Sequence, residues 1–255
     1  MRRLASFALS LIATATLLAP GLAALAAHGH WTYTGQTGPA FWGTIEEDYH
    51  TCAAGRTQSP IDIRGASVHA SDVPALEFNY QPSMLKIIDN GHTIQVNYAP
   101  GSFMSVGGKR YELQQFHFHK PSEERVDGKS YDMVAHLVHK DADGKLAVVA
   151  VLLTKSDTPN SLIKALWDNL PKKKEVETPV DKVTINATDL LPASRAYYTF
   201  SGSLTTPPCS EGVTWFVLKS PTVMSADEIE RFGKSYPMNA RPVQPLNGRE
   251  IKAGG

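Results

Sequence analysis

The sequence has few cysteines and no internal repeats. Only Cys52 and Cys209 occur among its 255 residues, so the chain can form at most one internal disulfide and no disulfide scaffold. A packed apolar core must therefore hold the fold together. The hydrophobic content of 42% is sufficient for one sizeable domain.

An excess of charge of one sign is also missing. The chain has 25 basic and 25 acidic residues, and the longest basic run is the triplet 172–174. Proteins that bind nucleic acid or acidic membrane surfaces usually carry a basic patch. We therefore expect no nucleic-acid or membrane partner.

A long apolar run occurs only at the beginning of the chain. Arg2 and Arg3 precede the apolar residues 4–18, and small residues at the spacing of a cleavage site follow at 24–26. This pattern is typical of a secretory signal peptide and is too short for a comfortable membrane span. We expect residues 1–26 to be removed, leaving a single domain, 27–255, that is periplasmic or secreted.

Export changes the interpretation of the two cysteines. In an oxidising compartment a single Cys52–Cys209 disulfide is the natural expectation, and two separate buried thiols are the alternative.

Short apolar runs separated by turn signals dominate the rest of the chain. Expected strands cover 83–88, 93–98, 111–120, 131–139, 146–153 and 213–218, and expected helices cover 161–170 and 225–232. The sequence predicts a mainly β (α+β) fold. One large, twisted, mostly antiparallel central sheet should carry a few short peripheral helices.

The stretch QFHFH, residues 115–119, places two imidazoles on one strand. Side chains alternate along a strand, so Gln115, His117 and His119 share one face, and the two phenylalanines share the other. His136 lies in the strand expected to pair with this one. Alone, such a histidine is more often a core residue. Three imidazoles on one face with a fourth position open are typical of catalytic zinc.

A cupin is the rival interpretation of the same residues. His117, His119 and Glu123 resemble the first metal motif of cupins, in which the glutamate is a ligand and the metal is often iron or manganese. The usual companion motif fails, because Lys140 stands where an asparagine is expected. Whether Glu123 is a ligand separates the two interpretations.

Six motifs in order give the chain a family resemblance. They are QSPIDI (58–63), NGH (90–92), QFHFH (115–119), HLVH (136–139), SLTTPPC (203–209) and NARPVQPLNGR (239–249). Together they resemble an α-class carbonic anhydrase of the secreted bacterial kind, over essentially the whole mature chain. The resemblance implies reversible hydration of carbon dioxide to bicarbonate and a proton. A metal-free binding module of the same fold is the non-enzyme alternative.

The resemblance also implies roles for individual residues. His117, His119 and His136 would bind Zn²⁺, and zinc-bound hydroxide would attack CO2. Thr205 would accept a hydrogen bond from that hydroxide and donate one to Glu123. His92 would be the histidine proton shuttle.

The remaining implied residues surround that centre. The wall for CO2 would comprise Val138, Val148, Leu204, Val213 and Trp215, with Thr206 beside it. Gln115 would bind the ring of His117, and Tyr33, Asn90 and Gln95 would order a water chain. The disulfide would anchor the Thr205 loop. The sequence does not fix the oligomeric state, for which a homodimer is one option.

One position departs from the family pattern. Members usually carry a glutamate two residues before the third zinc histidine, where it binds that ring, but Val134 stands here. Asp132 is on the same face but two residues further away. Either His136 lacks an acceptor and zinc dissociates faster, or another residue supplies one.

Overall fold

The computed structural model describes residues 30–65, 68–70 and 73–254. The expected signal peptide, 1–26, lies outside these residues. Within them, no helix is long and apolar enough to cross a membrane.

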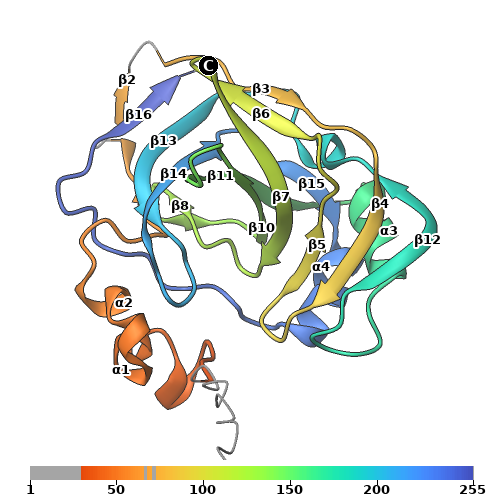
Figure 1. Cartoon of the computed structure of the whole chain (residues 1–255), viewed down its shortest axis with the longest axis horizontal. Coiled ribbons are helices and arrows are strands. Elements are labelled where there is room, and N and C mark those ends of the chain that lie inside the picture. The colour runs from red at the N-terminus through yellow and green to blue at the C-terminus, as the bar shows by residue number, and fades with distance from the viewer. Residues whose placement is uncertain (1–29, 66–67, 71–72, 255) are drawn as a thin grey trace, which may run out of the picture.

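Strands make up most of the regular structure (Figure 1). They are β1 (Asp62–Ile63), β2 (Val68–Ala70), β3 (Glu77–Asn79), β4 (Ser83–Asp89), β5 (Ile94–Asn97), β6 (Phe103–Val106), β7 (Lys109–His119), β8 (Arg125–Val126), β9 (Lys129–Ser130), β10 (Met133–Lys140), β11 (Leu146–Ser156), β12 (Thr178–Ile185), β13 (Tyr197–Ser203), β14 (Glu211–Leu218), β15 (Thr222–Ser225) and β16 (Ile251–Gly254). The helices are α1 (Trp42–Ile45), α2 (Thr51–Ala54), α3 (Ser161–Asp168) and α4 (Ala226–Ser235), and 3-10 turns occur at Gly35–Thr37, Glu47–Tyr49 and Ala187–Leu190.

One large sheet dominates the described part of the chain. Its main path runs β12-β4-β5-β7-β10-β11-β14-β13-β16-β2, and β1, β8 and β9 form a small separate sheet. Most neighbours are antiparallel, and β11 pairs with β14 in parallel. The predicted mainly β fold with a large, mostly antiparallel sheet is confirmed.

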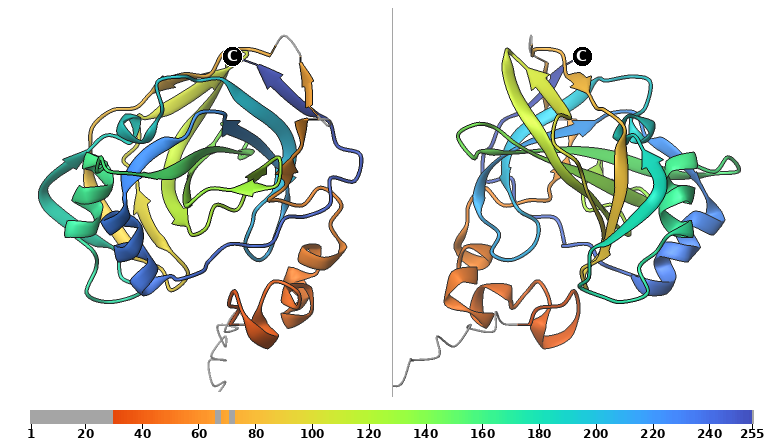
Figure 2. Two further views of the ribbon diagram at one scale, coloured as in Figure 1. Left: turned by 180° about the vertical axis from the view of Figure 1, so that it is seen from behind. Right: turned by 45° about the vertical axis from the view of Figure 1, so that its right-hand side comes forward.

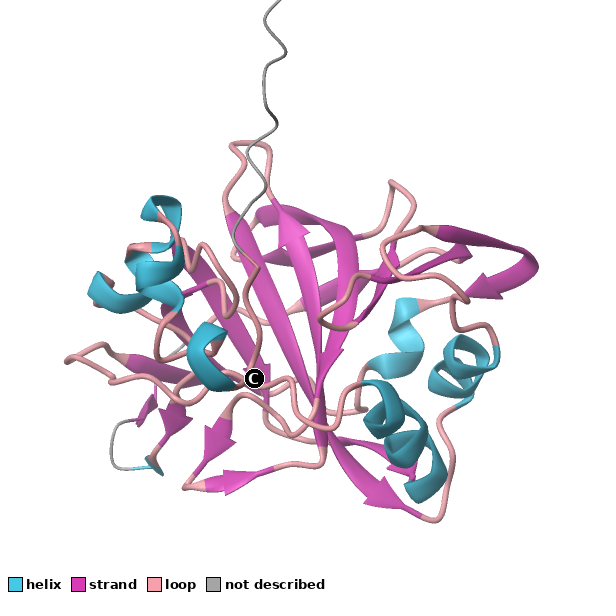
Figure 3. Cartoon of the chain, turned by 90° about the horizontal axis from the view of Figure 1, so that it is seen from below, coloured by secondary structure: helices cyan, strands magenta, loops and turns pink. Residues whose placement is uncertain are grey.

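The few helices lie at the periphery, as expected. Helices α1 and α2 lie on one side of the sheet, and α3 and α4 lie on the other (Figures 2 and 3). Helix α4 begins with a capping box, because Ser225 and Glu228 each accept a backbone N–H of the other. The Asn160 side chain caps α3 by accepting the backbone N–H groups of Leu162 and Ile163.

The central strands separate two apolar regions. Phe116 and Phe118 of β7 enter the larger core, where Phe118 contacts Trp167 of α3. On the opposite face, Val134, Val148 and Trp215 belong to a smaller apolar cluster. The alternation predicted for QFHFH thus places the phenylalanines in the core and leaves the histidines beside the smaller cluster.

Candidate metal centre and pocket

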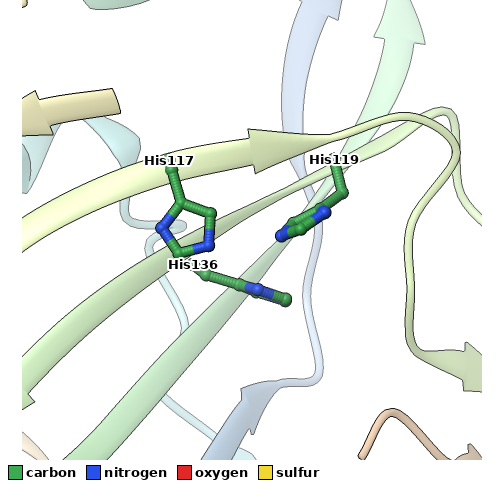
Figure 4. Close-up of side chains that lie close together, drawn as sticks. All are labelled: His117, His119 and His136. Carbon is green, nitrogen blue, oxygen red and sulfur yellow. The ribbon is translucent and has the colours of Figure 1, made fainter. Parts of the chain in front are cut away.

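The three histidines converge from neighbouring strands. His136 of β10 lies directly opposite His117 of β7, and His119 is two residues further along β7. One nitrogen from each ring lies within 4.8 Å of the others, and Figure 4 shows the rings turned toward a common point. Antiparallel pairing and strand alternation are sufficient to produce this arrangement.

The second nitrogen of each ring has its own acceptor. His117 Nδ1 lies 2.9 Å from Gln115 Oε1, and His119 Nδ1 lies 2.8 Å from the carbonyl oxygen of Asn239. His136 Nε2 lies 3.0 Å from Glu124 Oε1. The nitrogens left for a metal are therefore Nε2 of the first two rings and Nδ1 of His136.

The donor set fits a zinc ion. His119 Nε2 is buried and has no hydrogen-bond partner within the described part of the chain, which is costly unless a metal or another ligand completes it. Burial, assisted by His136, lowers the pKa of His117 to about 3 and that of His119 well below its usual value. Neutral imidazoles are the form that binds zinc.

His136 has a different electrostatic environment. Burial opposes its charged form, but the carboxylates of Glu124 and Glu123 outweigh that effect and raise its pKa. Asp132, which the sequence placed too far away, accepts a hydrogen bond from the backbone of Lys155 at 2.7 Å instead. The acceptor missing at Val134 is therefore supplied by Glu124.

Glu123 lies behind the centre rather than in it. The ring nitrogens of His117, His119 and His136 form a group that, among the described residues, does not include Glu123. Its Oε1 accepts the backbone N–H of Arg241 at 2.7 Å. Burial raises the pKa of Glu123 to about 7, against the lowering effects of His136 and of hydrogen bonds from Thr205 and Arg241.

A cavity of about 260 Å³ opens above the three histidines. Its lining includes most of the expected site residues: Tyr33, Asn90, His92, Gln95, Gln115, Val138, Val148, Leu204, Thr205, Thr206 and Trp215. Of the residues expected to form the CO2 wall, Val213 is the exception, because its side chain is packed in the apolar cluster and is not among the lining residues.

His92 projects from a structured turn at the edge of this cavity. Asn90 Oδ1 accepts the backbone N–H groups of His92 and Thr93 at 3.0 and 2.9 Å, an Asx turn that explains the preference for asparagine. The imidazole stacks on Trp31, with ring centroids 3.6 Å apart. Burial and the nearby His30 lower the pKa of His92, despite the opposing effect of Glu175.

The loop opposite the histidines is fixed by distant residues. The expected disulfide joins Cys52 to Cys209, and the Cys209 N–H donates to the carbonyl of Thr206 at 2.8 Å. The buried Arg241 guanidinium donates to Gln58 Oε1 at 2.9 Å and to the carbonyl of Cys52 at 3.0 Å. Chain segments far apart in sequence therefore hold Thr205 in place.

Three residues that contact the histidines of the site were missed from the sequence. Trp31, Glu124 and Asn239 contact His92, His136 and His119 respectively. Asn239 belonged to a quoted motif but received no role. Trp31 and Glu124 carried no local signal, because their contacts depend on tertiary packing.

A three-histidine centre at the base of a partly apolar pocket, carried on a large sheet, is typical of a metalloenzyme. Comparison with known proteins identifies the family. The sequence model of the family described as eukaryotic-type carbonic anhydrase matches residues 37–254. The carbonic anhydrase of Nostoc sp. is 45% identical over 225 residues, which are 87% of this chain and 85% of that protein. The carbonic anhydrase of Neisseria gonorrhoeae is 42% identical over 243 residues, covering 92% and 93% respectively.

A solved structure agrees. The α-carbonic anhydrase of Thermovibrio ammonificans, in complex with the inhibitor sulfanilamide, superposes with a TM-score of 0.84 at 40% identity, covering 88% of this chain and 99% of that one. The chain therefore belongs to the α-class carbonic anhydrase family, an enzyme family that acts on CO2 and bicarbonate. The cupin interpretation is wrong.

Proposed function

We propose that this enzyme catalyses the reversible hydration of carbon dioxide at a zinc ion held by His117, His119 and His136. The convergence of their three free ring nitrogens at the base of the cavity carries the proposal. His117 and His119 would bind through Nε2 and His136 through Nδ1.

Zinc supplies the Lewis acid of this chemistry. When bound by three imidazoles, it lowers the pKa of a water molecule to about 7, a magnitude for which carbonic anhydrase is itself the standard example. The chain must then orient the attacking oxygen, receive CO2 and carry away a proton.

Thr205 and Glu123 are suited to the first task. The Thr205 hydroxyl would donate to the buried Glu123 carboxylate, which would direct the lone pair of Thr205 Oγ1 toward the cavity. That lone pair would accept a hydrogen bond from the attacking oxygen. The Arg241 N–H fixes the carboxylate from behind.

An apolar wall is suited to receiving CO2, which carries no net charge. Val138, Val148, Leu204 and Trp215 line one region of the cavity, with Thr206 at its edge. Val213 would act indirectly, through its packing behind them.

His92 is suited to transferring the proton to solvent. It lines the same cavity as the three ligands, and imidazole is the side chain whose ordinary pKa lies closest to neutral pH, although burial lowers the pKa of His92. Tyr33, Asn90 and Gln95 also line the cavity and would order the water through which the proton moves. The disulfide supports a periplasmic or secreted location after removal of residues 1–26.

Metal analysis combined with a CO2 hydration assay tests the proposal. Purified protein should contain one zinc per chain, lose hydration activity when a chelator strips the metal, and regain it on reloading with zinc. A metal-free protein without activity after reloading would favour the binding module. Activity that requires iron and not zinc would also contradict the proposal.

A further inference from the structure

Glu124 is a buried carboxylate with a single side-chain partner. It is 0% exposed, and its Oε1 and Oε2 lie 3.0 and 3.2 Å from Nε2 of His136. Within the described ranges, the His136 ring is the one group that hydrogen-bonds to the Glu124 side chain. A carboxylate removed from water is costly unless it is paired, so this contact has to compensate for its burial.

The backbone on both sides of Glu124 is fixed. Ser122 Oγ donates to the carbonyl of Glu124 at 2.8 Å, and the Arg125 N–H donates to the carbonyl of Ile61 at 3.2 Å. Arg125 begins β8, which pairs with Asp62 of β1. These contacts direct Glu124 inward, while the adjacent Glu123 accepts the Arg241 N–H.

Val134 is apolar where the family usually has its glutamate. It is 0% exposed, lies on the same strand face as His136, and pairs with His119 on one side and Leu152 on the other. Its side chain belongs to the apolar cluster that includes Val148. A carboxylate at position 134 would enter this cluster close to the one already present at Glu124.

We propose that Glu124 is the positioning residue for His136 and that it replaces, from the loop after β7, the carboxylate usually supplied at position 134. By accepting the Nε2–H, it selects the tautomer with a free Nδ1 and holds the ring so that Nδ1 faces the metal. This inference rests on the proposed zinc site and goes beyond it, because it assigns the orientation of one ligand to a residue elsewhere in the chain.

Zinc release to a chelator measures this role directly. Because partners of ligand histidines typically contribute about 10–100-fold to metal affinity or activity, Glu124→Ala should release zinc faster by about that factor. The rate of zinc release from Glu124→Gln should lie between those of the parental protein and Glu124→Ala, since the amide oxygen still accepts a hydrogen bond. Glu124→Gln also keeps the side-chain shape, so the test survives if Glu124→Ala does not fold. Glu228→Gln, at a buried carboxylate in the α4 capping box, is the matched control and should release zinc at the parental rate.

Exchanging the two positions completes the test. Val134→Glu alone should lower thermal stability without slowing zinc release. The double variant, Glu124→Ala with Val134→Glu, should release zinc more slowly than Glu124→Ala alone. The absorption spectrum of the cobalt(II)-substituted protein should change in Glu124→Ala and not in the Glu228→Gln control.

The outcomes separate this inference from the proposed function. A parental protein that retains zinc, with Glu124→Ala and Glu124→Gln releasing it at the parental rate, would overturn the assignment of Glu124 alone. Slower release from Val134→Glu by itself would also overturn it, by showing that His136 lacked an acceptor. A parental protein that binds no zinc would overturn the proposed function and this inference together.

Discussion

The two sides of the pocket are built in different ways. One side consists of β7 and β10, where the backbone register alone brings His117, His119 and His136 together. The other side is the loop that carries Thr205, which is held by a disulfide and by Arg241. The first side depends on neighbouring hydrogen-bonded strands, and the second depends on contacts between distant segments.

This difference suggests a division of labour. The strand side would hold the metal, and the loop side would orient the reaction at it. Damage to the loop should then reduce turnover before it reduces zinc retention. The predictions for the ligand histidines, the disulfide and Thr205 test the two sides of that comparison.

Removal of a ligand should have the largest effect. His117→Ala or His119→Ala should abolish both zinc retention and CO2 hydration, because two imidazoles cannot hold the ion as three do. The domain should remain folded, since the sheet and its larger core are unaffected. Metal analysis, hydration kinetics and circular dichroism provide the three readouts. Normal activity in either variant would contradict the ligand assignment.

Loss of the disulfide should mainly affect the loop side. The bridge closes 157 residues, so chain entropy predicts a stabilisation of about 5 kcal/mol as an upper figure. Cys52→Ser with Cys209→Ser should lower the thermal midpoint and the hydration rate while zinc release stays near the parental value. The parental protein under reducing conditions is the parallel sample. Two free thiols in native protein, detected by mass analysis, would remove the premise.

Acid stability should depend on a histidine outside the pocket. His139 lies on the opposite face of β10 from His136, with Nε2 2.8 Å from the hydroxyl of Tyr80. Burial lowers the pKa of His139 to about 4, so the unfolded chain binds this proton more readily than the folded one.

The resulting stability is fully present above about pH 6.5 and is lost as the pH falls toward 4, by up to about 3 kcal/mol. Denaturant unfolding of the metal-free protein across this range should show a steeper pH dependence in the parent than in His139→Gln. Identical slopes would mean that His139 does not contribute.

Replacement of the proposed shuttle should produce the smallest effect. His92→Ala should lower maximal turnover by about 100-fold, at the lower end for positioned proton-transfer groups, and kcat/KM much less. Small imidazole buffers should restore part of the loss. Equal losses in both constants, without rescue by buffer, would mean that His92 is only a turn residue.

The same two-sided construction explains how much could be predicted from the sequence. Alternation in QFHFH and the expected pairing of strands 111–120 and 131–139 were sufficient to predict that His117, His119 and His136 share a face, because strand geometry is local. The acceptor of His136 was not predictable in this way. Glu124 lies in a loop, and its side chain reaches His136 only because β8 pairs with β1 and turns that side chain inward.

The residues of the loop side could be predicted mainly from the family resemblance. Arg241 had no role in the sequence interpretation, although its buried guanidinium connects Gln58 with the backbone of Cys52. Such contacts join residues nearly two hundred positions apart, and no local periodicity reports them. The position of Val213 was also not predictable from the sequence, since an apolar residue on a buried strand can either line a pocket or pack behind it.

A single substitution, Thr205→Val, tests the division between the two sides most directly. It removes the hydroxyl while retaining the shape of the side chain and leaves all three imidazoles in place. If the loop orients the reaction and the strands hold the metal, kcat/KM for CO2 hydration should fall on the order of 100-fold, while zinc release to a chelator stays at the parental rate. Parental kcat/KM, or zinc release accelerated to the same extent, would contradict the account.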